Sequence, residues 1–152
     1  MRTYLPIPKG EHTAMPYLTV KNAPAAIAFY IQAFDAAEVG RLMMGGRIAH
    51  AELSVGDSKI MLAEENLEWG NKSPSTLGDT PVLISLYVAD VDATFAKAIA
   101  AGGEALTPVK DEFYGLRVGQ LRDPFGHKWH ISSHIEVVSF EEMQRRCDAM
   151  MT

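Results

Sequence analysis

Two stretches of the chain share one arrangement of apolar and polar positions. Each starts with a short apolar run that ends in valine, turns through two residues, and continues with apolar residues at helical spacing. The matching positions are Val20, Ile27 and Ile31 in the first stretch and Val88, Phe95 and Ile99 in the second. A short apolar run predicts a strand, and the i, i+4 spacing predicts an amphipathic helix. Each half of the chain is therefore predicted to begin with a strand followed by a helix.

The segments that follow the two predicted helices are also alike. In the first half, AAEVGRLMM, RIAHAELSV and SKIMLAEE read as strands separated by glycine turns. In the second half the strands are GEALTPV, GLRVGQL and KWHISSHI, and Asp123-Pro124-Phe125-Gly126 has the proline and glycine typical of a type I turn. Each half thus reads as a β-α-β-β-β module. The predicted fold class is α+β, with curved mixed sheets around a cleft.

The predicted organisation is one domain made of the two modules, with an extension at each end. The connection between the modules is polar and long, which is typical of lids and mobile loops. We expect Trp69 within it to cover apolar surface, and a substrate clamp is the alternative. Ser139, followed three residues later by Glu142, predicts a capped C-terminal helix. The expected segments are the extension 1–14, the domain 15–136 with modules 15–64 and 82–136, the loop 65–81 and the helix 137–152.

Alternation along two of the predicted strands separates a polar face from an apolar one. In RIAHAELSV, His50, Glu52 and Ser54 share a face, and Ala49, Ala51, Leu53 and Val55 share the other. In KWHISSHI, His130, Ser132 and His134 lie opposite Trp129, Ile131 and Ser133. The apolar sets are expected to pack under the helices. The polar sets would then line the concave side of each sheet.

Charge and composition exclude several functional classes. The net charge of -5 and the lack of a basic cluster argue against binding to nucleic acid or to an anionic membrane. No apolar run approaches the roughly 20 residues of a membrane-spanning helix, and the N-terminus lacks the apolar core of a secretory signal. Cys147 is the only cysteine, so no disulfide can form within the chain, and a reducing, cytoplasmic location is expected. No GxGxxG motif follows a strand, so dinucleotide binding is not predicted.

Three phrases of the sequence resemble a known superfamily. AIAFYIQAF, HAELSVGDSKIMLAEE and YGLRVGQLRDPFGHKW are similar to the vicinal oxygen chelate proteins, which include glyoxalase, bleomycin-resistance protein and extradiol dioxygenases. The resemblance covers about residues 14–136 and is greatest to the PhnB-like branch. It implies the paired-module fold and a homodimer in which residues of both chains can line each cleft. Small sheets with open edges also favour pairing.

The resemblance also implies positions for four metal ligands in the metal-dependent members, two from each module. These fall on Met15, Glu52, Leu83 and His130 of this sequence. Met15 and Leu83 cannot replace the usual ligands of Zn, Ni or Fe, so two of the four positions keep a donor. No cofactor is therefore predicted. The alternative is a divalent metal (Zn, Ni, Fe or Mn) bound by His50, Glu52 and His130.

Two further histidines and one arginine have simpler explanations. His127 follows the turn glycine, where its side chain is expected to hydrogen bond to the backbone, and a strand spacing of three puts it on the opposite face from His130. His134 lies near a strand end and is expected to meet solvent. Arg117 could bind an anionic ligand, with a surface ion pair as the alternative.

The sequence thus predicts a protein that binds a small organic molecule without a firmly held metal. The residues expected to line its cleft are Met15, His50, Glu52, Leu83, Arg117 and His130. Glu52 and His130 are the candidates for proton transfer if a reaction occurs, because a carboxylate beside an imidazole fixes its tautomer. The alternatives are a metal-dependent lyase, isomerase or dioxygenase, and a protein that sequesters a toxic compound unchanged.

Overall fold

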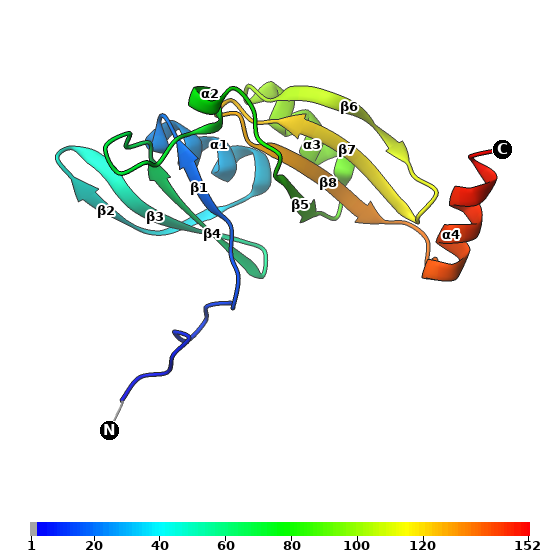
Figure 1. Cartoon of the computed structure of the whole chain (residues 1–152), viewed down its shortest axis with the longest axis horizontal. Helices are drawn as coiled ribbons and strands as arrows, with labels where there is room; N and C mark the ends of the chain where they lie inside the picture. The colour runs from blue at the N-terminus through cyan, green and yellow to red at the C-terminus, as the bar shows by residue number, and fades with distance from the viewer. Residues whose placement is uncertain (1–2) are drawn as a thin grey trace. The chain divides into compact units, whose positions relative to one another are not determined.

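The first half of the chain folds into a four-stranded sheet with one helix on one face (Figure 1). The computed structural model describes residues 3–152, and the chain divides into two compact units between Asp79 and Thr80. In the first unit the sheet order is β1-β4-β3-β2, with β1 parallel to β4 and the other pairs antiparallel. The elements are β1 (Tyr17–Val20), α1 (Ala23–Phe34), β2 (Ala37–Met44), β3 (Arg47–Val55) and β4 (Ser58–Glu64).

Helix α1 begins and ends where its local chemistry requires. The Asn22 side chain accepts the Ala25 N–H at 3.1 Å, so one otherwise unpaired donor of the first turn is satisfied. The helix stops at Asp35, whose φ of 54° is left-handed. Both Phe29 and Tyr30 are buried, and the rings of Tyr30 and Phe34 stack at 6.0 Å. These aromatic side chains make up much of the core beneath α1.

The sheet contributes the other side of this core. Buried apolar side chains project from the strands toward α1: Leu18 and Val20 from β1, Leu53 and Val55 from β3, and Ile60 and Leu62 from β4. We call the opposite side of each sheet, which its own helix does not cover, the open face.

The second unit repeats the first. Its sheet order is β5-β8-β7-β6, with β5 parallel to β8, and α3 packs on one face. The elements are β5 (Leu83–Tyr87), α3 (Val91–Ala100), β6 (Glu104–Asp111), β7 (Leu116–Arg122) and β8 (Lys128–His134). Both units therefore have the β-α-β-β-β order that the hydrophobic pattern predicts. The α+β fold class is confirmed.

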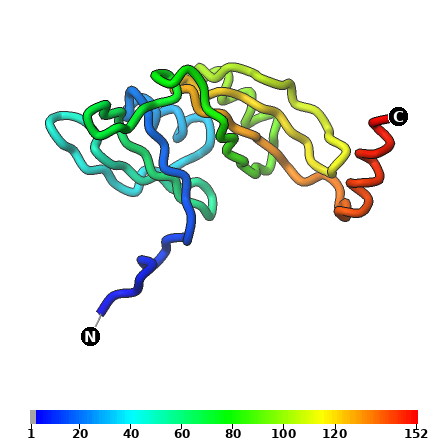
Figure 2. Tube along the Cα trace, viewed as in Figure 1, coloured from blue at the N-terminus to red at the C-terminus, as the bar shows by residue number. Residues whose placement is uncertain are grey.

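The segments outside the two sheets have structure of their own. The connection from β4 to β5, green in Figure 2, contains the short helix α2 (Pro74–Leu77), which the polar composition did not predict. The C-terminal helix α4 (Phe140–Ala149) is shorter than the predicted 137–152. Its N-cap is the predicted Ser139, whose hydroxyl accepts the Glu142 N–H at 3.2 Å. None of the helices within residues 3–152 is long and apolar enough to cross a membrane.

Candidate functional site

The polar residues of β3 lie on the open face of the first sheet, as alternation predicts. His50, Glu52 and Ser54 are half-buried, whereas Ala51, Leu53 and Val55 are buried on the α1 side. One position differs from strict alternation. Ile48 is buried rather than Ala49, because the pairing of β2 with β3 shifts between Leu42 and Met43. Such a β-bulge places an extra residue on one strand, and it lets Ile48 join the core while His50 still faces outward.

Tyr17, His50 and Glu52 form a chain of hydrogen bonds on this open face. The Tyr17 hydroxyl lies 2.7 Å from Nδ1 of His50, and Nε2 of His50 lies 3.3 Å from a Glu52 carboxylate oxygen. A carboxylate only accepts hydrogen bonds, so Nε2 of a neutral His50 carries the proton. Nδ1 is then the acceptor, and the Tyr17 hydroxyl donates to it. The oxygen of Tyr17 keeps lone pairs that can accept a hydrogen bond from a ligand.

A second ion pair lies at the far end of this chain. The Lys59 ammonium is 4.0 Å from the other Glu52 oxygen and donates a hydrogen bond to Glu11. The bond to Glu11 raises the pKa of Lys59 above its ordinary value, so the lysine stays charged beside Glu52. The open face therefore carries a charged ammonium beside the Glu52 side chain that bonds to His50.

Tyr17 is the residue that the sequence did not single out. It precedes the buried Leu18 and is 52% exposed, and the same alternation that placed His50 also places Tyr17 on the open face. The signal was therefore present in YLTV. Met15 lies just before β1 and is half-buried.

His130 occupies the open face of the second sheet. Its cross-strand neighbours are Gln120 on β7 and Ser85 on β5. Among the described residues, no hydrogen-bond partner is present for the buried Nδ1 of His130 or for the buried hydroxyl of Ser132, two residues further along β8. Buried polar atoms of this kind are usually satisfied by water or a ligand. Leu83, at the start of β5, is 43% exposed.

Arg117 takes the ion-pair role that the sequence left as the alternative. Its guanidinium donates two hydrogen bonds to Asp92 of α3, at 2.8 and 2.9 Å, and one to Asp111 at 2.8 Å. Bonding to Asp92 places Arg117 on the helix side of the second sheet, opposite the face of His130. These bonds raise the pKa of Arg117 and lower that of Asp92. Its donors therefore serve the second unit's own carboxylates.

The strand registers show which positions of the two units are equivalent. Met61 of β4 pairs with Tyr17 of β1 and Glu52 of β3. In the second unit, His130 of β8 holds the same place. The last-strand equivalent of His130 is therefore Met61, and Glu52 corresponds to Gln120. The last strands contribute Met61 and His130, and the first-strand positions are Met15 and Leu83. Among these four residues, only His130 carries a donor suited to Zn, Ni or Fe.

The remaining histidines of the second unit and the cysteine lie outside these positions. The His127 backbone N–H donates to the Asp123 carboxylate at 3.0 Å, and His134 is exposed near the end of β8. Cys147 is exposed on α4. Within the described part of the chain, no three histidine, cysteine, aspartate or glutamate side chains are grouped so that they could hold a metal ion.

Comparison with known proteins places this fold in a family. Residues 11–131 match the family model of the Glyoxalase/Bleomycin resistance protein/Dioxygenase superfamily. The chain belongs to this superfamily. An uncharacterized protein of Mycobacterium bovis is 41% identical over 138 residues, which cover 88% of this chain and 91% of the relative. A relative in Mycobacterium tuberculosis is also 41% identical, over 88% of this chain and 81% of its own length.

Solved structures show the same fold at lower identity. TioX from Micromonospora sp. ML1 superposes with a TM-score of 0.64 at 24% identity, over 84% of this chain and all of TioX. A glyoxalase-related enzyme from Fulvimarina pelagi gives 0.65 at 21% identity, over 81% of this chain and 88% of the enzyme. The fosfomycin resistance protein FosX from Listeria monocytogenes gives 0.62 at 18% identity, over 88% of this chain and 98% of FosX. One scaffold thus serves proteins with different names and tasks, so the ligand has to be argued from the residues of this chain.

Proposed function

We propose that this protein binds a small organic molecule on the open face of its first sheet, without a firmly held metal. The observation that carries this proposal is the hydrogen-bonded chain from Tyr17 through His50 to Glu52. Glu52 fixes the tautomer of His50, and His50 fixes the direction of the Tyr17 hydroxyl. A hydroxyl held in one orientation can recognise a ligand donor with little loss of entropy.

The same chain could also transfer a proton, which is the second candidate function. A proton removed from a bound ligand would pass to the Tyr17 oxygen as the Tyr17 proton passes to Nδ1 of His50. The imidazolium formed would lie beside the Glu52 carboxylate, which stabilises it. Positioned proton transfer of this kind accelerates a reaction by about 10²- to 10⁴-fold. It requires no metal ion.

The chemistry of the donors does not favour the metal-dependent alternative with His50, Glu52 and His130. Both nitrogens of His50 already take part in hydrogen bonds, one with Tyr17 and one with Glu52. Coordination through either nitrogen would break one of them. Of the ligand positions that the resemblance implies in the first unit, Met15 carries a thioether, which is a poor ligand for hard or borderline cations. The proposed proton transfer therefore uses only these side chains.

His130 is proposed as a separate ligand contact on the open face of the second unit, because its buried Nδ1 has no partner among the described residues. A ligand group that reached it would replace an unmade hydrogen bond, and removing such a deficit favours binding. We include Met15 and Leu83 as proposed apolar contacts. Arg117 is left out because Asp92 and Asp111 occupy its donors.

We also propose that the protein is a cytoplasmic homodimer of the PhnB-like branch. The edge strands β2 and β6 leave backbone groups unpaired in the described chain, and exposed edges favour association. The single cysteine, Cys147, is exposed and free, which suits a reducing compartment. Sedimentation velocity at micromolar concentration would separate a monomer from a dimer.

The binding proposal is tested by a thermal-shift screen of small metabolites and antibiotics, repeated on Tyr17→Phe. This variant removes one oxygen and keeps the ring. A compound that stabilises the parent chain should stabilise Tyr17→Phe much less, with an affinity reduced about tenfold. Tyr87→Phe, which removes an exposed hydroxyl of the second unit, is the matched control and should respond as the parent does.

Elemental analysis of protein purified without an affinity tag separates the proposal from its metal-dependent alternative. We expect well under one metal ion per chain. Stoichiometric metal that is lost in Glu52→Gln would overturn the metal-free proposal. Recovery of a bound compound unchanged after prolonged incubation would support binding and contradict proton-transfer catalysis on that compound.

A further inference from the structure

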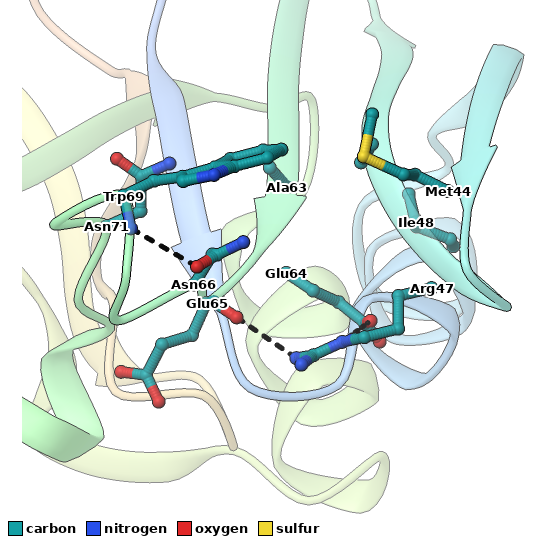
Figure 3. Close-up of a pocket in the computed structure, with 10 residues that line it drawn as sticks. Met44, Arg47, Ile48, Ala63, Glu64, Glu65, Asn66, Trp69 and Asn71 are labelled. Carbon is teal, nitrogen blue, oxygen red and sulfur yellow. Dashed lines mark hydrogen bonds and ion pairs between the residues drawn. The ribbon is translucent and has the colours of Figure 1, made fainter.

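A small pocket lies at the end of the first sheet, beside the loop that carries Trp69 (Figure 3). It encloses about 60 Å³. Figure 3 shows the indole of Trp69 on one side and the Met44 side chain on the other, with Ala63 between them and the Asn66 amide near the indole. Sites for whole drug-sized molecules usually measure about 300–1,000 Å³. This pocket therefore has room for one part of a ligand.

The Trp69 loop is held in place although the indole itself is 60% exposed. The backbone groups of Asn66 and Asn71 exchange two hydrogen bonds, at 3.0 and 2.9 Å. The backbone N–H of Trp69 donates to the Asn66 side-chain oxygen at 3.2 Å. Gly70, with φ of 78°, closes the turn by donating its N–H to the Leu67 carbonyl. These hydrogen bonds hold the turn that carries the indole before any ligand binds. Because the turn need not become ordered on binding, the entropic cost of binding is lower.

A carboxylate fixes the base of the same loop. Glu65 accepts hydrogen bonds from the backbone N–H and the hydroxyl of the buried Ser73, at 2.8 and 3.1 Å. Hydrogen bonds from Thr76 and Ser73 hold the pKa of Glu65 below its ordinary value. The loop is therefore joined to the start of α2. Trp69 lies on a short, closed segment.

The charged groups of the pocket are paired within the protein, and the Asn66 amide has a donor available. Arg47 donates to the Glu64 carboxylate and to the Glu65 carbonyl, both at 3.0 Å, and the other Glu64 oxygen accepts the Ala23 N–H at 3.3 Å. These charges are matched within the protein. Asn66 uses its side-chain oxygen for Trp69, so its amide NH₂ group can donate to a ligand.

The pocket adjoins the Tyr17–His50–Glu52 chain on the open face. Ala63, which lines it, is two residues from Met61 on β4, so both face the same way about 7 Å apart. Met61 is the strand partner of Tyr17 and of Glu52. Ala49, also part of the lining, precedes His50. A ligand extending about two residues along the strand would reach both places.

We propose that this pocket binds an uncharged planar aromatic or heteroaromatic ring, stacked on Trp69 and accepting a hydrogen bond from the Asn66 amide. This inference rests on the proposed function and names the class of its ligand: an aromatic ring joined to a polar arm that reaches Tyr17. The indole face gives stacking, Met44 packs on the other side of the ring, and the matched charges exclude an ionic ring. Sulfur–aromatic contact adds to the preference for a flat ring.

The test uses benzamide, which carries one ring and one carbonyl acceptor, and its saturated counterpart cyclohexanecarboxamide. Both are titrated into the ¹⁵N-labelled full chain while the two indole N–H signals are followed by NMR. The buried Trp129, whose N–H bonds to Asp123, is an internal reference. Benzamide should shift the Trp69 signal saturably and leave the Trp129 signal in place. Cyclohexanecarboxamide should bind about tenfold more weakly because it cannot stack.

Three variants complete the design. Trp69→Leu keeps an apolar side chain, assigns the indole signal, and should abolish the benzamide shifts of neighbouring backbone amides. Asn66→Asp keeps the side-chain oxygen that accepts the backbone N–H of Trp69 but removes the NH₂ donor. It should weaken benzamide binding about tenfold. Leu67→Ala, an exposed side chain of the same loop outside the pocket lining, is the control and should bind as the parent does.

Benzamide is too short to depend on Tyr17, so the two proposals can fail separately. Equal binding of the two amides, or binding unaffected by Trp69→Leu, overturns the ring pocket even if screened compounds still require Tyr17. Suppose instead that benzamide binds selectively, but the screened compounds bind Tyr17→Phe as tightly as the parent chain. That result would support the ring pocket and overturn the proposed function.

Discussion

The buried indole of Trp129 donates its N–H to the Asp123 carboxylate at 2.9 Å. The other oxygen of that carboxylate accepts the backbone N–H groups of Phe125 and His127, at 2.9 and 3.0 Å. Asp123 is only 3% exposed, and its charge is satisfied by these donors. One carboxylate therefore closes the turn between β7 and β8 and fixes the first residues of β8. The open face of β8 carries His130.

Replacing Asp123 by Asn should destabilise the protein by about 2 kcal/mol. The amide keeps one oxygen for the two backbone donors, but its NH₂ group then meets the Trp129 N–H, and a buried donor loses its partner. Chemical denaturation followed by fluorescence would measure the change. Glu141→Gln, at an exposed position of α4, should change stability by less than about 0.5 kcal/mol. Equal effects of the two substitutions would contradict the role given to Asp123.

Gly115→Ala should destabilise the second unit by about 3 kcal/mol or more. Gly115 has φ of 88°, and an added Cβ would overlap the carbonyl oxygen of Glu136. The Gly115 carbonyl also accepts the N–H groups of Ile135 and Glu136, so this backbone cannot move away freely. Gly45→Ala is the control: its φ is 57° with open space around it, and about 1 kcal/mol is expected. Thermal unfolding of both variants gives the comparison.

Arg117→Ala should lower the melting temperature slightly and leave ligand affinity unchanged. The arginine connects Asp92 of α3 with Asp111 of β6 through hydrogen bonds on the helix side of its sheet. Its loss leaves two solvent-accessible carboxylates, which water can satisfy. Compounds found by the thermal-shift screen provide the affinity measurement. A marked loss of affinity would show that Arg117 contributes to binding after all.

Helix α4 should loosen at acid pH. Arg145 and Arg146 hold the pKa of Glu142 at about 2, and Arg146 also lowers the pKa of Glu136 and donates to the Phe113 carbonyl at 2.8 Å. Because the pKa in the folded state lies below the ordinary value of 4.5, this stabilisation is complete above about pH 4.5. It is lost as the pH falls toward 2.

NMR signals of the α4 backbone, followed from pH 6 to pH 2, test this expectation. Glu142→Gln should show near neutral pH the loosened helix that the parent chain shows only near pH 2. Glu141→Gln, one residue away, is the control and should keep the parent's pH dependence. Identical titrations for the parent and Glu142→Gln would refute the proposed contribution of Glu142.

Much of the fold and part of the candidate site could be predicted from the sequence. The repeat of a strand, a helix and three strands required only the period of apolar residues, because burial of one face dictates that period locally. The same alternation placed His50 and Glu52 together on the open face. It could also have placed Tyr17 there. The family followed from phrases that span both modules, and residues 11–131 bear it out.

Only the tertiary structure decided which of these residues meet. The pairing of β1, β3 and β4, which are separated in sequence by a helix and a hairpin, brings Tyr17 to His50 and makes Met61 the equivalent of His130. A bulge in β3 places Ile48 in the core where alternation predicts Ala49. Arg117 donates to Asp92, which lies 25 positions away in the sequence. Alternation fixes the face of a side chain from its nearest neighbours, but register and ion pairing depend on contacts between distant segments that no local pattern encodes.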